Sequence, residues 1–417
     1  QARTPTEHAY TSSVQVISYR AAMTRFLHTS DWQLGMTRHY LSKRGDDDPQ
    51  ARFTADRIEA VRRLGDVAHQ EGCEFVVVAG DVFETQNVSA QIIARACEAM
   101  ASIDIPVYLL PGNHDSLEPG CLWDGQDFLR RCPSNVHVLR DQAETQVTNG
   151  NGLVIATIVA APLTTRHPST DPLAKLAMSL KPTETPRILV GHGQLEGLSG
   201  DTRDALISRS PLDEAIARGA LHYVALGDRH IAWPLNDDHA AIRYSGTQES
   251  TSFNEVGVGT TVIVDLGDPL TCQTIDVGTW LHARVSQEVA GEADLQILRD
   301  RLDSFDHRDR TIIRYDLHGQ VTIPQQAELD EILADYETVF ASLEPSENRH
   351  DLTVVGNDIS LAEADVPGWV REAAEELSGM CATNDDAVAA LTLLHRLVNA
   401  EEAGTAPTVA HTVEVSR

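Results

Sequence analysis

Hydrophobic spacing alternates between two periods along the first 110 residues. A β-branched run at 75–79 predicts a strand buried on both faces, and apolar runs at 25–28 and 107–110 predict two more strands. Between them, apolar residues recur at helical spacing over 54–70 and again over 89–102. Strands and helices that alternate with short connections form parallel sheets with crossover helices. The pattern therefore predicts an α/β fold.

Further elements follow, and the texture of the chain then changes. Strands are expected at 136–139, 153–161, 188–190, 223–226, 242–245, 260–265, 311–317 and 352–355, with 242–245 and 260–265 antiparallel. Helices are expected at 172–180, 211–218, 327–333, 366–378 and 385–402, the last two amphipathic. Beyond about residue 276 acidic residues dominate, and the elements up to residue 355 form a small α+β module.

Polar clusters follow five of the predicted strands. They are Asp31 with Gln33, Asp81, Asn113 with His114 and Asp115, His192, and Asp228 with His230. Ligands of open α/β sheets bind beyond the carboxyl ends of the strands, so Asp31, Asp81 and Asn113 are expected on one rim. Singly, Asp81 could be a helix N-cap and His192 a buried structural histidine. Five such clusters at strand ends favour a metal site instead.

The chemistry of these side chains suits a pair of divalent cations. A carboxylate between two cations can bridge them, while neutral amide and imidazole groups complete each set of ligands without excess charge. Two cations about 3.5–4 Å apart can activate water and clamp a phosphoryl oxygen during in-line displacement. A neighbouring acid must then protonate the leaving group. The clusters therefore indicate hydrolysis of a phosphoester.

Charge restricts how such a protein could meet nucleic acid. The chain has 417 residues, which is enough for two domains, and 42% of them are hydrophobic, which is enough for a sizeable core. Its net charge is -29. Phosphate contacts dominate affinity for DNA, so an acidic protein repels DNA at long range. Action on DNA would need local arginine clusters, bound metal or a partner. The acidity could equally reflect solubility or a salty cytoplasm.

Cysteine usage and hydropathy indicate the compartment. The six cysteines include no Cys-x-x-Cys pair, which favours reduced thiols in a cytoplasmic protein. No apolar run approaches the ~18 residues that span a bilayer, so no membrane span is expected. The N-terminus lacks the apolar core of a signal peptide, and Met23 is a plausible start.

The ordered motifs resemble those of the calcineurin-like metallophosphoesterases. They are Asp31-x-Gln33, Gly80-Asp81, Gly112-Asn113-His114-Asp115, Gly191-His192 and Gly227-Asp228-Arg229-His230. The segments 28–32 and 80–83 are similar to the SbcD-type DNA repair nucleases in particular. The resemblance implies a sandwich of mixed β-sheets flanked by helices. It also implies four ranges: a polar extension (1–22), a catalytic domain (23–275), an α+β capping domain (276–360), and C-terminal helices with a tail (361–417).

The resemblance assigns metal ligands to the clusters. Asp31 and His230 would bind the first metal, and Asp81 would bridge the two. Asn113 and His192 would bind the second metal.

Four further residues complete the expected site. His114 would be the proton donor, and Asp115 would orient it. The family pattern has histidine where Gln33 and Asp228 stand. These oxygen ligands shift the expected pair of divalent ions from zinc towards Mn2+, with Mg2+ or Fe2+ as alternatives. They could also weaken binding, leave one metal site, or abolish activity.

The leading hypothesis is a metal-dependent phosphodiesterase acting on DNA, an exo- or endonuclease in DNA repair. The resemblance implies a coiled-coil ATPase partner of SbcC type that docks on the helices of 361–417, although these helices could simply pack on the capping module. A homodimer is also compatible with the sequence. Two alternatives stay open: a phosphoesterase for a small phosphorylated compound, and a catalytically weak scaffold subunit. Trp32 and Trp123 could stack on a base or pack at the rim.

Overall fold

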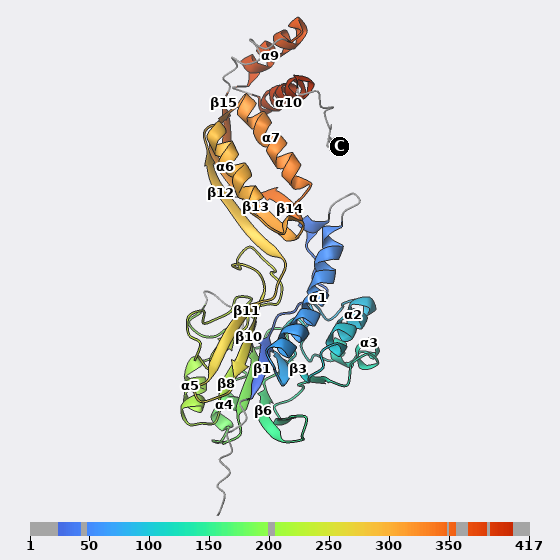
Figure 1. Ribbon diagram of the computed structural model, residues 1–417, viewed down its shortest axis with the longest axis vertical. Coiled ribbons are helices and arrows are strands. Elements are labelled where there is room, and N and C mark those ends of the chain that lie inside the picture. Colours follow the sequence, from blue (N-terminus) through green and yellow to red (C-terminus); the bar gives the residue numbers. More distant parts are fainter. Residues whose placement is uncertain are drawn as a thin grey trace, which may run out of the picture.

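The computed structural model describes most of the chain (Figure 1). The described residues are 24–42, 48–198, 205–347, 350–355, 366–381 and 384–402. The predicted extension at 1–22, the start at Met23 and the polar tail after residue 402 lie outside them. None of the described helices is long and apolar enough to cross a membrane.

A six-stranded sheet carries the first three polar clusters. Its order is β11-β10-β1-β2-β3-β4, with bounds β1 Arg25–Thr29, β2 Phe75–Val78, β3 Val107–Leu109, β4 Val136–Val138, β10 Thr260–Asp265 and β11 Thr271–Asp276. Strands β1 to β4 are parallel, and β10 runs antiparallel to β1 as predicted. The helices on its outer side are α1 (Pro49–Gln70), α2 (Ala90–Ala101) and the short α3 (Gln126–Leu129). Ser89 caps α2 by accepting a hydrogen bond from the Ile92 amide.

A five-stranded sheet packs against one face of the first sheet. Its order is β5-β6-β7-β8-β9, with bounds β5 Thr145–Thr148, β6 Val154–Ala160, β7 Arg187–His192, β8 Tyr223–Gly227 and β9 Ile242–Tyr244. Its helices are α4 (Ala174–Ser179) and α5 (Arg209–Ala217). The antiparallel prediction for 242–245 was wrong, because β9 is parallel to β8. The long connection between them returns the chain to the starting edge, as a parallel pair requires.

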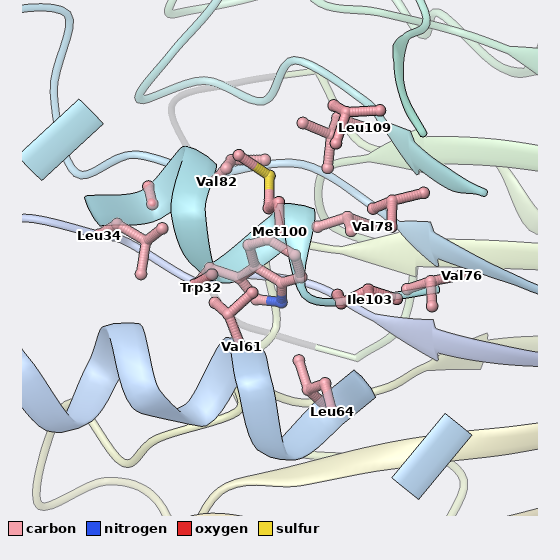
Figure 2. Packing of buried hydrophobic residues seen from close by; sticks show 14 of the residues in the cluster. Trp32, Leu34, Val61, Leu64, Val76, Val78, Val82, Met100, Ile103 and Leu109 are labelled. Atoms are coloured by element: carbon pink, nitrogen blue, oxygen red, sulfur yellow. The ribbon is translucent and has the colours of Figure 1, made fainter. Parts of the chain in front are cut away.

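Three apolar layers hold these sheets and helices together. Residues such as Phe26 and Tyr223 fill the space between the two sheets, and a second layer lies under α4 and α5. The third packs the helices on the first sheet through Val61 and Leu64 of α1 and Met100 of α2 (Figure 2). Trp32 and Trp123 are fully buried, so neither can stack on a base. The layering confirms the predicted α/β sandwich of mixed sheets flanked by helices.

A third sheet stands apart at the upper end of Figure 1. Its parallel strands are β12 (Leu281–Val289), β13 (Thr311–Thr322), β14 (Ser342–Pro345) and β15 (Asp351–Val355), and β13 pairs with all the others. Helices α6 (Glu292–Asp303) and α7 (Ile323–Glu337) cover it, followed by α9 (Gly368–Met380) and α10 (Asp385–Glu402). Ile323, Ala374 and Leu391 join α7, α9 and α10 in a small apolar cluster. These helices therefore pack on the module, which is one of the two alternatives that the sequence left open.

A buried carboxylate fastens the connection between the lower and upper sheets. Glu249 is fully buried and accepts hydrogen bonds from the amides of Thr279 and Trp280, at 2.8 and 2.9 Å. The Arg63 guanidinium of α1 pairs with the same carboxylate. Trp280 itself packs with Phe53 of α1 in an apolar cluster that also includes Ile312 of β13. The connection is thus tied to α1 and not loose.

Candidate metal centre

The polar clusters meet where the carboxyl ends of two sheets come together. Asp31, Asp81 and Asn113 follow β1, β2 and β3 of the first sheet, so they share one rim as predicted. His192 ends β7 and Asp228 follows β8, both in the second sheet. Main-chain hydrogen bonds join neighbouring ends, including Asp31 N to Gly80 O at 3.0 Å and Gln33 N to Asp81 O at 2.8 Å. The two sheets therefore bring the clusters to one place.

Backbone strain is concentrated at this place. Within the described residues, four non-glycine residues have a positive φ: Asp31 at 54°, Gln33 at 44°, Asp81 at 53° and Asp228 at 95°. Such angles are uncommon outside glycine and cost of order 1–3 kcal/mol each. Strain of this kind persists where the surrounding structure enforces it, and it clusters at functional sites.

Three glycines allow the strand ends to approach one another. A Cβ on Gly80 would lie 2.1 Å from His192 Nδ1, and one on Gly112 would lie 2.2 Å from Asp81 Oδ1. A Cβ on Gly227 would lie 1.9 Å from the carbonyl oxygen of Ala79. Any side chain at these positions would push the polar groups apart.

One half of the site is built by Asp81, Asn113 and His192. Nε2 of His192 lies 2.8 Å from Asn113 Oδ1 and 3.4 Å from Asp81 Oδ2. Candidate ligand atoms of Asp31, Asp81 and His192 all lie within 4.8 Å of one another, and all three residues are buried. The Nδ1 of His192 is 2.8 Å from Ala79 O, so it donates there and leaves Nε2 facing the carboxylates. This arrangement suits a cation.

The other half is built by Asp31, Gln33 and His230. Nε2 of His230 lies 3.7 Å from Asp31 Oδ1 and 3.3 Å from Gln33 Nε2. Gln33 Oε1 is buried and has no hydrogen-bond partner among the described residues. A buried amide oxygen without a partner is costly. A cation would satisfy this oxygen, so the donor set fits a metal here as well.

Asp228 lies beside both halves. Its main-chain amide lies 3.1 Å from each carboxylate oxygen of Asp31, and its Oδ1 is 3.9 Å from His192 Nε2. The carboxylate at this position is therefore close enough to the ligands of both halves to influence a cation in either.

A carboxylate that sequence analysis missed supports His230. Nδ1 of His230 lies 2.8 Å from Thr251 Oγ1 and 3.1 Å from Glu255 Oε1. Such a carboxylate fixes the ring and its tautomer, and leaves the far nitrogen for a metal. Burial alone would raise the pKa of Glu255, but His230 and Thr251 lower it to about 2. Glu255 follows no predicted strand, so no pattern in the sequence points to it.

Charge in the buried site favours a cation. Burial raises the pKa of Asp31, and the nearby Asp81 carboxylate adds to the increase although His230 and His192 oppose it. Burial would also raise the pKa of Asp81, but His192 and His114 outweigh it and hold it at about 2. Two buried carboxylates this close destabilise each other unless positive charge lies between them.

His114 lies beside Asp81 and is partly exposed. Its main-chain amide donates to Asp81 Oδ1 at 2.9 Å, and its Nδ1 lies 2.7 Å from the carbonyl oxygen of Glu84. Its Nε2 faces the site, 3.9 Å from Asp81 Oδ2, and the side chain is 25% exposed. A half-buried imidazole with one fixed nitrogen can hold or deliver a proton at the other.

The predicted role of Asp115 requires correction. Its carboxylate accepts hydrogen bonds from the amides of Gly112 and Phe83, at 2.7 and 3.0 Å. The imidazole of His114 is oriented by the Glu84 carbonyl instead. Burial and the nearby Asp81 carboxylate raise the pKa of Asp115 to about 7. Asp115 therefore joins two loops of the site, because consecutive side chains at a strand end point in different directions.

Two clefts open on either side of Asp228. One, of about 290 Å³, is lined by Asn113, His192 and Asp228 together with apolar side chains that include Ile207. The other, of about 410 Å³, is lined by Asp228, Arg229, His230 and Glu255. A substrate can reach both halves of the site from these clefts.

Comparison with known proteins identifies the family. The model of the calcineurin-like phosphoesterases matches residues 24–232, half of the chain, and the chain belongs to this family. The resemblance predicted from the motifs is thereby confirmed. The family uses a dinuclear metal site, and its members are hydrolases.

Several curated proteins are similar to the chain. The uncharacterized metallophosphoesterase YhaO of Bacillus subtilis is 27% identical over 237 residues, 56% of this chain and 55% of YhaO. The DNA double-strand break repair protein Mre11 of Haloferax volcanii is 23% identical over 367 residues, 85% of this chain and 74% of that protein. The chain thus spans about half of one relative and three quarters of the other. A purple acid phosphatase structure from yellow lupin covers 62% of this chain and 52% of its own, at 13% identity and a TM-score of 0.34.

Proposed function

We propose that this protein is a divalent-metal-dependent phosphodiesterase that cleaves DNA. The observation that carries the proposal is the buried group of Asp31, Asp81 and His192, joined by Asn113 and His230, in a metallophosphoesterase fold. The similarity to the Mre11 protein of Haloferax volcanii covers 85% of this chain, which is more than the range 23–275 alone could supply. Hydrolysis of a phosphodiester in DNA is the reaction that both observations support.

Each residue of the site receives a role in this proposal. Asp31 and His230 hold one cation, Asn113 and His192 hold the other, and Asp81 lies between them. Gln33 would add an oxygen ligand in the half of Asp31 and His230, and Asp228 would add one beside both halves. Divalent cations at such a site polarise a phosphoryl oxygen and generate a nucleophile from water.

His114 is the proposed proton donor. Its Nδ1 is engaged with the Glu84 carbonyl, so Nε2 is the atom that delivers a proton to the leaving oxygen. Asp115 acts indirectly, by holding the loop that carries Asn113 and His114.

The proposed metal is Mn2+. Gln33 and Asp228 present oxygen where the family pattern has imidazole, and oxygen ligands favour Mn2+, Mg2+ or Fe2+ over zinc. A chelated preparation resupplied with each metal in turn tests this choice. We expect Mn2+ to give the highest rate on linear DNA, and Zn2+ to give the lowest.

The upper part of the molecule receives two roles. We propose that 276–360 is a capping domain above the catalytic domain of 23–275, and that α9 and α10, within 361–417, dock an ATPase subunit of SbcC type. Exposed apolar side chains support the docking role, with Trp369 70% exposed and Leu393 52% exposed. Co-purification with such a subunit, lost in Trp369→Ala, tests it. A homodimer through the same helices would appear instead as a doubled mass in solution.

The decisive experiment is metal-dependent hydrolysis of linear DNA by the full chain, with Asp81→Asn as control. Cleavage that needs metal and disappears in the variant supports the proposal. Two bound metals and turnover of a small phosphodiester without DNA cleavage would favour the second candidate, a phosphoesterase for small compounds. The net charge of -29, which repels DNA, favours that candidate. No bound metal at all would leave a scaffold role.

A further inference from the structure

Two arginines of the third sheet are stacked on aromatic rings beside the metal centre. Arg284 of β12 and Arg314 of β13 stand opposite each other in the parallel register. The Arg284 guanidinium lies 5.3 Å from the centre of the Phe253 ring, and that of Arg314 lies 4.8 Å from the same ring. Arg314 also lies 5.8 Å from the centre of the Tyr40 ring. We call these four residues the arginine platform.

The platform places two like charges side by side on neighbouring strands. Neither guanidinium forms an ion pair with a carboxylate in the part of the chain that the structure describes, although Glu344 stands opposite Arg314 on β14. Like charges opposite each other on neighbouring strands repel. The chain has 62 acidic and 33 basic residues, yet these two adjacent arginines form no ion pair among the described residues. An anion bound from outside would remove the repulsion.

The geometry of the platform suits phosphate groups in particular. Arginine presents a planar fork of donors that matches phosphate oxygens, and stacking on a ring fixes the fork at a low cost in side-chain entropy. Arg284 is exposed, and Arg314 is half-buried. The donors therefore remain accessible while the rings hold the stems.

A short chain of contacts connects the platform with the metal centre. Phe253 lies between Thr251 and Glu255, the two residues that hold Nδ1 of His230. Two residues of extended chain span at most about 7 Å, so Phe253 is near the ring that would bind metal. Arg38 adds a third positive charge in between, since its Nη2 donates to the carbonyl oxygen of Thr251 at 2.9 Å. The positive groups thus lead from the site towards the third sheet.

We propose that Arg284 and Arg314 bind backbone phosphates of a nucleic-acid strand whose scissile phosphate occupies the metal centre. The inference rests on the proposed function. It names the surface that favours a nucleic-acid strand over a substrate with a single phosphate. A substrate with one phosphate cannot occupy the site and the platform together, whereas a strand can. The platform also supplies the local attraction that an acidic protein needs in order to meet DNA.

Binding and cleavage measured separately test the inference. Binding of a fluorescein-labelled single-stranded oligonucleotide to the full chain in EDTA is followed by anisotropy over a range of salt. The double variant Arg284→Gln/Arg314→Gln should bind more weakly at low salt, and its slope of log affinity against log salt should be shallower by about 1.4. Cleavage is then compared between the oligonucleotide and bis(p-nitrophenyl) phosphate. The ratio of kcat/KM for the two substrates should fall about tenfold in the double variant.

Two controls isolate the platform. Arg95→Gln removes an exposed arginine of α2 and should leave both ratio and slope unchanged. Arg284→Lys/Arg314→Lys keeps the charge and should keep most of the salt slope. An unchanged slope and ratio in the glutamine double variant would overturn the inference, and so would a wild-type protein that binds no oligonucleotide. If the wild type binds through these arginines but cleaves no DNA, the arginines still bind backbone phosphates, whereas the proposed function fails.

Discussion

The two halves of the metal centre share strained backbone but differ in how their side chains are held. In the half built by Asp81, Asn113 and His192, the imidazole is anchored to the main chain, at Ala79 O. In the half built by Asp31, Gln33 and His230, it is anchored to side chains of a loop, at Thr251 and Glu255. The first anchor is part of the sheet edge, whereas the second depends on two replaceable groups.

One departure from the family pattern, Gln33, lies in the half that a loop supports, and the other, Asp228, lies beside both halves. Gln33 and Asp228 stand where the family pattern has imidazoles, and both have a positive φ. Gln33 also keeps its main-chain hydrogen bond to Asp81 O. The comparison teaches that backbone geometry and ligand identity are specified separately. The sheet edges determine where ligands stand, and the side chains then tune which metal they suit.

The largest effect is expected from Asp81→Asn, because Asp81 lies between the halves. The variant keeps the acceptor for the His114 amide but loses the charge that a pair of cations requires. We expect both metals to be lost together. Activity should fall by more than roughly 100-fold, because replacing a residue that only supports a metal ligand already costs up to about that much. Metal analysis after gel filtration checks this, with the exposed Asp104→Asn as control. Retention of one equivalent would show that the halves fill independently.

His114→Asn should separate chemistry from metal binding. The variant removes the proposed proton donor and keeps a polar side chain at that position. We expect kcat to fall by about 100- to 10,000-fold with metal content unchanged. A substrate with a good leaving group, such as p-nitrophenolate, needs less protonation and should lose less. Equal losses on both substrates would contradict the role of His114 as a proton donor.

Glu255→Gln should weaken only the half supported by the loop. The amide cannot match the charged partner that His230 Nδ1 now has. Loss of such a partner typically costs about 10- to 100-fold in metal affinity. Calorimetric titration with Mn2+ should therefore show one weakened and one unchanged site. The exposed Glu98→Gln serves as the matched control. Equal weakening of both sites would remove the distinction between the halves.

Gln33→His should sharpen the same distinction through metal choice. Histidine tolerates a positive φ better than most residues, so the substitution fits the backbone angle of 44°. An added imidazole favours zinc, and we expect the affinity for Zn2+ relative to Mn2+ to rise on the order of tenfold. Competition titration measures the ratio. A ratio that stays constant would mean that position 33 contributes no ligand.

The smallest effect concerns His282, which contacts Ser250 in the loop that holds His230, and it depends on pH. Burial lowers the pKa of His282 to about 4, where it contacts Ser250 and Tyr40. Its ordinary value is 6.5, so between pH 6.5 and 4 the unfolded chain takes up a proton that the folded chain does not. Stability should therefore fall as pH decreases through this window, by at most about 3 kcal/mol.

Urea unfolding at pH 7 and pH 5 measures this contribution. His282→Gln should lose stability at pH 7 but depend less on pH than the wild type. The exposed His69→Gln should retain the full dependence. An identical dependence in His282→Gln would assign the effect to other groups.

The sequence predicted the parts of the molecule that arise from local patterns. Apolar runs predicted nine of the eleven strands of the two lower sheets, all but β5 and β11. The clusters from Asp31 to His230 were found because each follows a strand directly. Glu255 was missed because it comes from a loop that only the tertiary fold brings to His230. The role of Asp115 was wrong because spacing along a chain does not determine side-chain direction. The parallel orientation of β9 was missed for a similar reason, since a long connection can return to either edge.

The buried Glu249 carboxylate has a consequence for how the molecule responds to heat. It binds the connection at Thr279 and Trp280 to Arg63 of α1, so the upper sheet cannot detach without breaking these hydrogen bonds and exposing the apolar cluster of Trp280 and Phe53. A loose tether would let the upper sheet melt first, in a separate transition. With this joint, melting of one part removes the support of the other, and the two should unfold as a single cooperative unit.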